Sequence, residues 1–211
     1  MRSGIRTGVP DGVLGPLPGP GGPGDVGDVG DVVRRALLAR RVILLHGELD
    51  DAAVAEAAAT LLMLDAGGDE RIVVRLTGTS ASIDAALVLM DVMEVAGVPV
   101  DTVAAGTISG GAIGILAAGR QRRLAPHARL RLFEPDTSVA GRAADVEQAL
   151  AAQSSQRDRF LQRLSDCTRR PVAHVAREWG GGAYLEPEDA IVLGYADEVE
   201  GGSPTTGRTD V

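Results

Sequence analysis

The residues with the clearest chemical potential lie in one glycine-rich segment, where an apolar stretch runs into small residues typical of a helix start. Segment 106–119 reads GTISGGAIGILAAG and follows the apolar stretch 98–105. A strand that turns sharply into a helix points several backbone N–H groups at one spot. Nucleophile elbows and oxyanion holes are built from this geometry. Gly110 stands where a nucleophile is expected, and Ser109 lies one position earlier.

Ser109 is the nearest hydroxyl, but one residue along an early helix turns a side chain by about 100°. A serine nucleophile also needs a base within about 3 Å. The three histidines are His46, His127 and His174, and no two of them are close in sequence. We interpret all three as surface or packing residues, and Ser109 as a small residue at a helix start.

The composition limits the classes of function. The chain has 211 residues, of which 45% are hydrophobic and 2% aromatic, so we expect one domain with an aliphatic core. A net charge of −8 argues against nucleic acid as a partner. The single cysteine, Cys167, excludes an internal disulfide framework and fits a reducing compartment. No apolar run reaches membrane-spanning length and no signal-peptide pattern is present, so we expect a soluble, cytoplasmic protein.

The chain divides into a folded region and two tails. Residues 1–31 are rich in glycine and proline and end in a Gly-Asp-Val repeat, which predicts a flexible arm. Residues 201–211 predict a disordered tail. Residues 32–200 form the expected domain.

The expected elements alternate. Helices are predicted at 32–40, 51–65, 83–95, 142–168, 171–179 and 188–193, and one further helix runs from the elbow to 118. Strands are predicted at 41–46, 71–76, 99–105, 128–133 and 197–199. Asp50 and Ser82 are predicted helix caps, and the second helix is expected to bury a stripe that includes Leu61 and Leu62. The alternation indicates an α/β fold with a mainly parallel sheet. The functional edge of such a sheet lies at the strand ends, here the predicted turns at 78–82 and 106–111.

At these two turns the chain resembles the proteolytic subunit of the ATP-dependent Clp protease, a serine peptidase family. The family's Ser-Pro-Gly-Gly-Ser turn appears here as GTSAS at 78–82, and its elbow Gly-Gln-Ala-Ala-Ser-Met-Gly-Ala aligns without a gap from Gly106. Segments 126–135 and 171–199 also track the family's pattern. The resemblance implies a crotonase-like fold of repeated β-β-α units, with outer helices and a long protruding handle helix.

The same resemblance places the catalytic triad on three residues that cannot perform it. Gly110 falls on the serine, Phe133 on the histidine and Gly182 on the aspartate. Glycine supplies no nucleophile, phenylalanine accepts no proton, and a second glycine orients nothing. The two oxyanion donors fall on Ala81 and Gly111, whose backbone N–H groups survive substitution of the side chains. The resemblance implies no metal and no cofactor.

Assembly features of the family are only partly kept. Segment 142–168 matches the handle through which two rings meet, with Asp145 and Glu147 as ring contacts, while the arginine that helps to latch the rings is replaced by Gly181. Val73 and Arg75 stand where aromatic side chains line the docking groove for the Clp ATPase. We therefore expect weakened ATPase docking, although Arg75 also fits a solvated edge residue.

Four functions remain open. The first is a catalytically inactive subunit that joins homo- or hetero-oligomeric rings with paralogues. The second is an active peptidase that uses Ser109. The third is an acyl-CoA binding protein of the crotonase-like fold, for which Asp84 and Glu134 are the nearest acidic residues. The fourth is a scaffold protein that recruits a partner through the arm.

Overall fold

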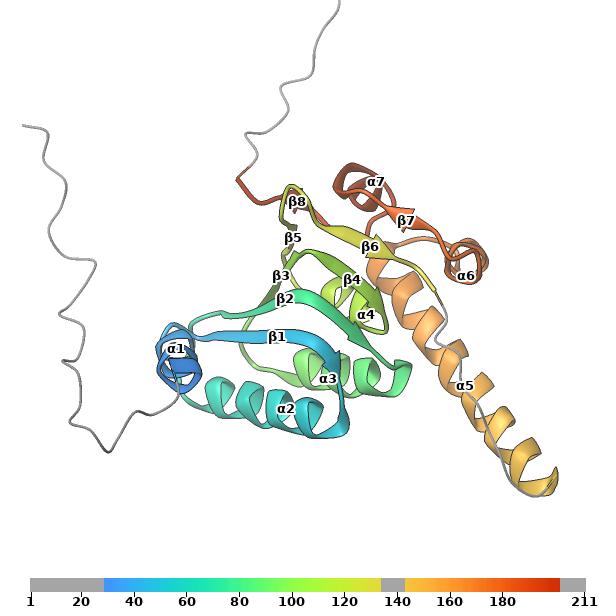
Figure 1. Ribbon diagram of the computed structural model, residues 1–211, viewed down its shortest axis with the longest axis horizontal. Coiled ribbons are helices and arrows are strands. Elements are labelled where there is room, and N and C mark those ends of the chain that lie inside the picture. Colours follow the sequence, from blue (N-terminus) through green and yellow to red (C-terminus); the bar gives the residue numbers. More distant parts are fainter. Residues whose placement is uncertain (1–28, 134–142, 202–211) are drawn as a thin grey trace, which may run out of the picture.

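A mostly parallel eight-stranded sheet forms the frame of the protein (Figure 1). The computed structural model describes residues 29–133 and 143–201, so the predicted arm and tail lie almost wholly outside the described residues. The strands are β1 (Val42–Leu49), β2 (Ile72–Ala81), β3 (Val100–Ala105), β4 (Thr107–Gly110), β5 (Arg122–Leu124), β6 (Arg129–Arg131), β7 (Tyr184–Leu185) and β8 (Glu198–Val199). The helices are α1 (Val29–Leu38), α2 (Asp51–Ala66), α3 (Ile83–Val95), α4 (Ala112–Ala117), α5 (Ala143–Thr168), α6 (Val172–Gly180) and α7 (Pro187–Val192). The predicted α/β class, with its outer helices and long helix, is confirmed.

The sheet divides into two branches along the long strand β2. The N-terminal half of β2 pairs with β3, and the ladder continues through β5 to β8. The C-terminal half pairs with β4, and that ladder continues through β6 to β7. β1 follows β2 along both halves, and only the β6–β7 pair is antiparallel. The second branch carries the segments that the sequence singles out for chemistry.

Two glycines lie together where the branches diverge. Gly78 in β2 and Gly106 between β3 and β4 both have positive φ, +54° and +68°. A Cβ on Gly106 would lie 3.4 Å from the backbone nitrogen of Gly78. The predicted turn at 78–82 is wrong, because β2 continues as far as Ala81. Gly78 is the extra residue of a β-bulge opposite His46 and Gly47, and β2 continues beyond it.

Helices α2 and α3 lie side by side along β1 and β2 (Figure 1). The predicted caps are confirmed: the side chain of Asp50 accepts a hydrogen bond from the N–H of Ala53, and that of Ser82 from the N–H of Ala85. The predicted buried stripe of α2 is partly wrong, because Leu61 is buried but Leu62 is half-exposed. α2 is apolar on nearly every face, so its sequence does not define a single buried stripe.

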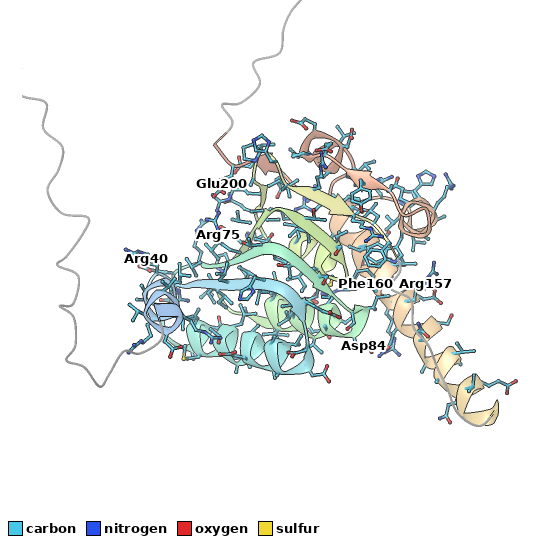
Figure 2. All side chains as sticks on the ribbon, viewed as in Figure 1. Arg40, Arg75, Asp84, Arg157, Phe160 and Glu200 are labelled. Carbon is cyan, nitrogen blue, oxygen red and sulfur yellow. The ribbon has the colours of Figure 1, made fainter. Side chains whose placement is uncertain are left out.

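The long helix α5 is fixed to the domain by its C-terminal half. Phe160, labelled in Figure 2, is buried, as are Leu161 and Leu164. The Phe160 ring meets that of Trp179 on α6 edge to face, with 5.0 Å between centroids. The N-terminal half extends away from the sheet (Figure 1). α1 begins at Val29, so the last residues assigned to the arm are helical. The short strands β4, β5 and β7 were not predicted. β4 lies inside the predicted turn at 106–111, and β5 and β7 have only two or three residues, too few for a periodic signal.

Candidate functional site

The elbow predicted from the sequence is present between β4 and α4. Gly110 is the last residue of β4, it is buried, and its φ is +56°. Gly111 follows at the cap position of α4. A left-handed residue between a strand and a helix is the backbone of a nucleophile elbow. The elbow geometry is therefore kept, and its central residue has no side chain.

The three residues matched to the triad lie at the ends of neighbouring strands. Gly110 ends β4, and Phe133 lies two residues beyond the end of β6. The N–H of Leu132 donates to the carbonyl of Ala183 at 2.8 Å, which places Gly182 beside this same strand end. Gly182 has φ +66°, and a Cβ there would meet no atom within 4 Å. The fold thus gathers the three positions at one edge of the second branch, with no nucleophile, base or orienting carboxylate among them.

Phe133 belongs to an aromatic stack around an arginine. The guanidinium of Arg131 lies 4.5 Å from the Phe133 ring centroid and 5.7 Å from that of Tyr184. Arg131 pairs with Tyr184 on β7 and with Ser109 on β4. Cation–π contact with two rings holds the guanidinium beside Phe133, the residue matched to the triad histidine. This cluster was not predicted, although the two-residue spacing of Arg131 and Phe133 within the predicted strand 128–133 was a usable signal.

Among the residues that the structure describes, no base pairs with Ser109 in the sheet. Ser109 is half-buried, and its ladder neighbours are Ser80 on β2 and Arg131 on β6. All three histidines are exposed, and they belong to three different parts of the fold: His46 lies in β1, His127 precedes β6 and His174 lies in α6. Because an arginine takes up no proton at neutral pH, this arrangement does not activate the Ser109 hydroxyl.

The two matched oxyanion donors lie against each other in the sheet. The N–H of Gly111 donates to the carbonyl of Ala81 at 2.8 Å. Ala81 itself pairs with Leu49 on one side and Gly110 on the other. A donor that already has a backbone acceptor is not available to a substrate oxygen. The Gly111–Ala81 bond is a feature that sequence reasoning missed.

The remaining candidate acidic residues lie elsewhere. Asp84, in the first turn of α3, is exposed and lines a groove between α3 and α5. Glu147 is exposed on α5; Asp145 is in the same helix, but its side chain lies outside the described residues, as does all of Glu134. Across 29–133 and 143–201, no cluster of side chains has the composition of a metal site. No helix in the described part of the chain is long and apolar enough to cross a membrane.

The strand matched to the ATPase-docking groove carries ionic contacts. Arg75 forms an ion pair with Glu200 at 3.0 Å (Figure 2). On the same branch Arg71 contacts the buried carboxylate of Asp101 at 2.6 Å. Val73 is half-buried beside them. Charged and aliphatic side chains thus occupy the face where the family resemblance implies aromatic ones.

A comparison with known protein families shows which family the chain belongs to. The sequence profile described as Clp protease matches residues 26–202. The chain belongs to the Clp protease family. It is 29% identical over 178 residues to ATP-dependent Clp protease proteolytic subunit 2 of Thermobifida fusca (strain YX), covering 82% of this chain and 88% of that protein.

Two further relatives carry similar names. ATP-dependent Clp protease proteolytic subunit 4, chloroplastic, of Arabidopsis thaliana is 27% identical over 166 residues, covering 77% of this chain and 57% of that protein. ATP-dependent Clp protease proteolytic subunit 1 of Rhodopirellula baltica (strain DSM 10527 / NCIMB 13988 / SH1) is 25% identical over 173 residues, covering 81% and 76%. The resemblance drawn from the two turns is therefore confirmed at the level of the family.

Proposed function

We propose that this chain is a catalytically inactive Clp proteolytic-subunit homologue that serves as a structural or regulatory subunit of a ClpP-type ring. One observation carries the proposal: Gly110 in the elbow, Phe133 after β6 and Gly182 before β7 lie at one edge of the sheet, and none of them has a side chain that can act in catalysis. Covalent peptide hydrolysis needs a nucleophile, a proton acceptor and a group that orients the acceptor. Without these three groups the edge of the sheet cannot hydrolyse a peptide by the triad mechanism, although the sheet and its helices are present.

The outer face of α2 supports a role in assembly. α2 is apolar nearly all round, although it lies at the surface of the isolated chain. Its exposed apolar residues are Ala52, Ala55, Ala59, Leu62, Met63 and Ala66. A helix that is apolar on every side is normally buried. We propose that a neighbouring subunit, either a second copy or an active paralogue, covers this face.

The ionic contacts on β2 support weak docking of a Clp ATPase. An apolar segment of a partner would have to displace or bury the Arg75–Glu200 pair, whose side chains are 40% and 36% exposed. Burying charged groups disfavours binding unless the partner pairs with them. We propose that this subunit contributes little to ATPase recruitment.

Native mass spectrometry of the chain, alone and mixed with an active proteolytic subunit, tests the assembly proposal. We expect the chain to be found in oligomers, including mixed ones. A strictly monomeric chain that binds no paralogue would contradict it.

A fluorophosphonate probe and a fluorogenic peptide test the proposed inactivity. We expect no labelling and no turnover by the chain alone. Labelling that disappears in Ser109→Ala would instead establish an active peptidase that uses Ser109. The acyl-CoA alternative predicts a rise in melting temperature with acyl-CoA, which we do not expect because the Gly111 N–H already has an acceptor.

A further inference from the structure

Gly111 makes an unusually close backbone contact with the start of α3. A Cβ at position 111 would lie 2.1 Å from the carbonyl oxygen of Ser82 and 2.9 Å from the Cβ of Ala86. No side chain other than hydrogen fits at that separation. The family elbow has methionine after its serine, at the position of Gly111. The glycine therefore permits an approach that the family's residue would prevent.

The Ser82 carbonyl is held in place from its own side. It accepts the N–H of Ala86 at 3.1 Å, which is the first backbone hydrogen bond of α3. The Ser82 hydroxyl oxygen accepts the N–H of Ala85 at 3.1 Å. Moving this carbonyl away from Gly111 would disturb the cap of α3. The close contact is thus part of the helix start rather than a loose loop.

The same contact directs the Gly111 N–H into the sheet. The N–H donates to the Ala81 carbonyl at 2.8 Å, and the ladder beside it pairs Ser80 with Ser109 and Ala81 with Gly110. In a nucleophile elbow, the residue after the nucleophile supplies an oxyanion donor. That donor must lie free at about 2.7–3.1 Å from the developing oxyanion. In this chain the Gly111 N–H is instead bonded to the Ala81 carbonyl.

We infer that Gly111 seals the oxyanion position of the elbow, so that restoring the triad side chains alone does not restore hydrolysis. The inference rests on the proposed function, because it assumes that the elbow descends from a peptidase site. Loss of one oxyanion donor lowers the rate of acyl transfer by about a hundredfold to a thousandfold. The chain is thus inactive for two independent reasons, one in its side chains and one in its backbone.

Two restored variants test the seal. One carries Gly110→Ser, Phe133→His and Gly182→Asp; the second adds Gly111→Met. With a fluorophosphonate probe, the serine oxygen would bond to phosphorus, fluoride would leave, and the imidazole would take the serine proton. Because a Cβ at position 111 forces the elbow and the Ser82 carbonyl apart, we expect Gly111→Met to release the N–H of residue 111 from Ala81 and to make labelling about a hundredfold faster. A matched control carries Gly110→Ala in place of Gly110→Ser and is expected to remain unlabelled.

Equal labelling of the two restored variants would overturn the seal and leave the proposed function intact. Labelling of the unmodified chain would overturn the proposed function instead. If neither variant folds or reacts, amide hydrogen exchange of the unmodified chain by NMR decides. We expect the Gly111 amide to exchange roughly a hundredfold or more slowly than in unstructured peptide. Exchange at the unstructured rate would overturn the seal.

Discussion

Arg122 and Asp197 form a bidentate ion pair that closes the first branch of the sheet across 75 residues of sequence. The Arg122 backbone N–H also donates to this carboxylate at 2.9 Å. The other guanidinium nitrogen donates to the carbonyls of Cys167 and Gly194, at 3.1 and 2.7 Å. One arginine on β5 therefore joins the end of α5, the turn after α7 and the start of β8.

Acid is expected to weaken the protein through this pair. The hydrogen bonds from Arg122 lower the pKa of Asp197. A carboxyl with a lowered pKa in the folded state stabilises the fold above its unfolded pKa of about 3.9, and that contribution is lost as pH falls through the folded value. We expect the unfolding free energy to fall less steeply below about pH 4 in Asp197→Asn than in the unmodified chain. Urea melts across pH 2–6 measure it, with Asp69→Asn as an exposed control. Identical pH profiles for Asp197→Asn and the unmodified chain would contradict the prediction.

Arg71 is expected to matter because its partner is buried. The Asp101 side chain is 1% exposed, and its second carboxylate oxygen has no hydrogen-bond partner among the described residues. Removing one partner leaves a buried charge uncompensated, so Arg71→Met is expected to destabilise the fold by about 2–4 kcal/mol. Adding Asp101→Asn should recover part of this loss, because the residue left behind is neutral. Chemical denaturation of the two single variants and the double variant gives the coupling energy, and strict additivity would be the contrary result.

Gly114 is expected to tolerate no side chain. A Cβ there would lie 2.4 Å from Cε2 of Phe160 and 2.9 Å from the sulfur of Met90, both fully buried. Gly114→Ala is therefore expected to destabilise the fold by about 1–3 kcal/mol through overpacking between α4 and α5. Gly180→Ala is the matched control, because a Cβ at that position meets nothing within 4 Å. Equal melting temperatures for the two variants would contradict this packing argument.

A charge on the outer face of α2 is expected to reduce association. Leu62 and Met63 are 50% and 57% exposed in the isolated chain. Leu62→Glu should shift the mass distribution towards monomer without lowering the melting temperature of the monomer, because the side chain contributes little to the core. Val172→Glu introduces the same charge on α6 and should leave the distribution unchanged. Analytical ultracentrifugation compares them; an unchanged oligomer in Leu62→Glu would place the interface elsewhere.

The single cysteine is expected to report unfolding. Burial raises the pKa of the Cys167 thiol, against the opposing effect of Arg163 and Arg122. Since the thiolate is the reactive form, alkylation at pH 8 should be slow in the folded chain and should accelerate on denaturation. Rapid alkylation of the native chain, followed by mass spectrometry, would show that the end of α5 opens readily.

The sequence predicted the long elements well and the backbone of the site only in part. Asp50 and Ser82 were identifiable as caps because capping depends on local side-chain chemistry. The elbow was identifiable from its glycines. The pairing of Gly111 with Ala81 was not, because it depends on a register between segments 30 residues apart. The continuation of β2 through Gly78 was missed for the same reason, since a turn-like sequence became a bulged strand once β1 and β4 flanked it.

The paired glycines at 78 and 106 have a consequence for how such proteins evolve. They approach each other through backbone atoms, so this contact between the two branches uses no side chain. The strand ends can exchange polar for apolar residues while the frame around them is inherited unchanged. A lineage can therefore lose one set of reactive groups, and later acquire another at the same edge, without passing through an unfolded ancestor.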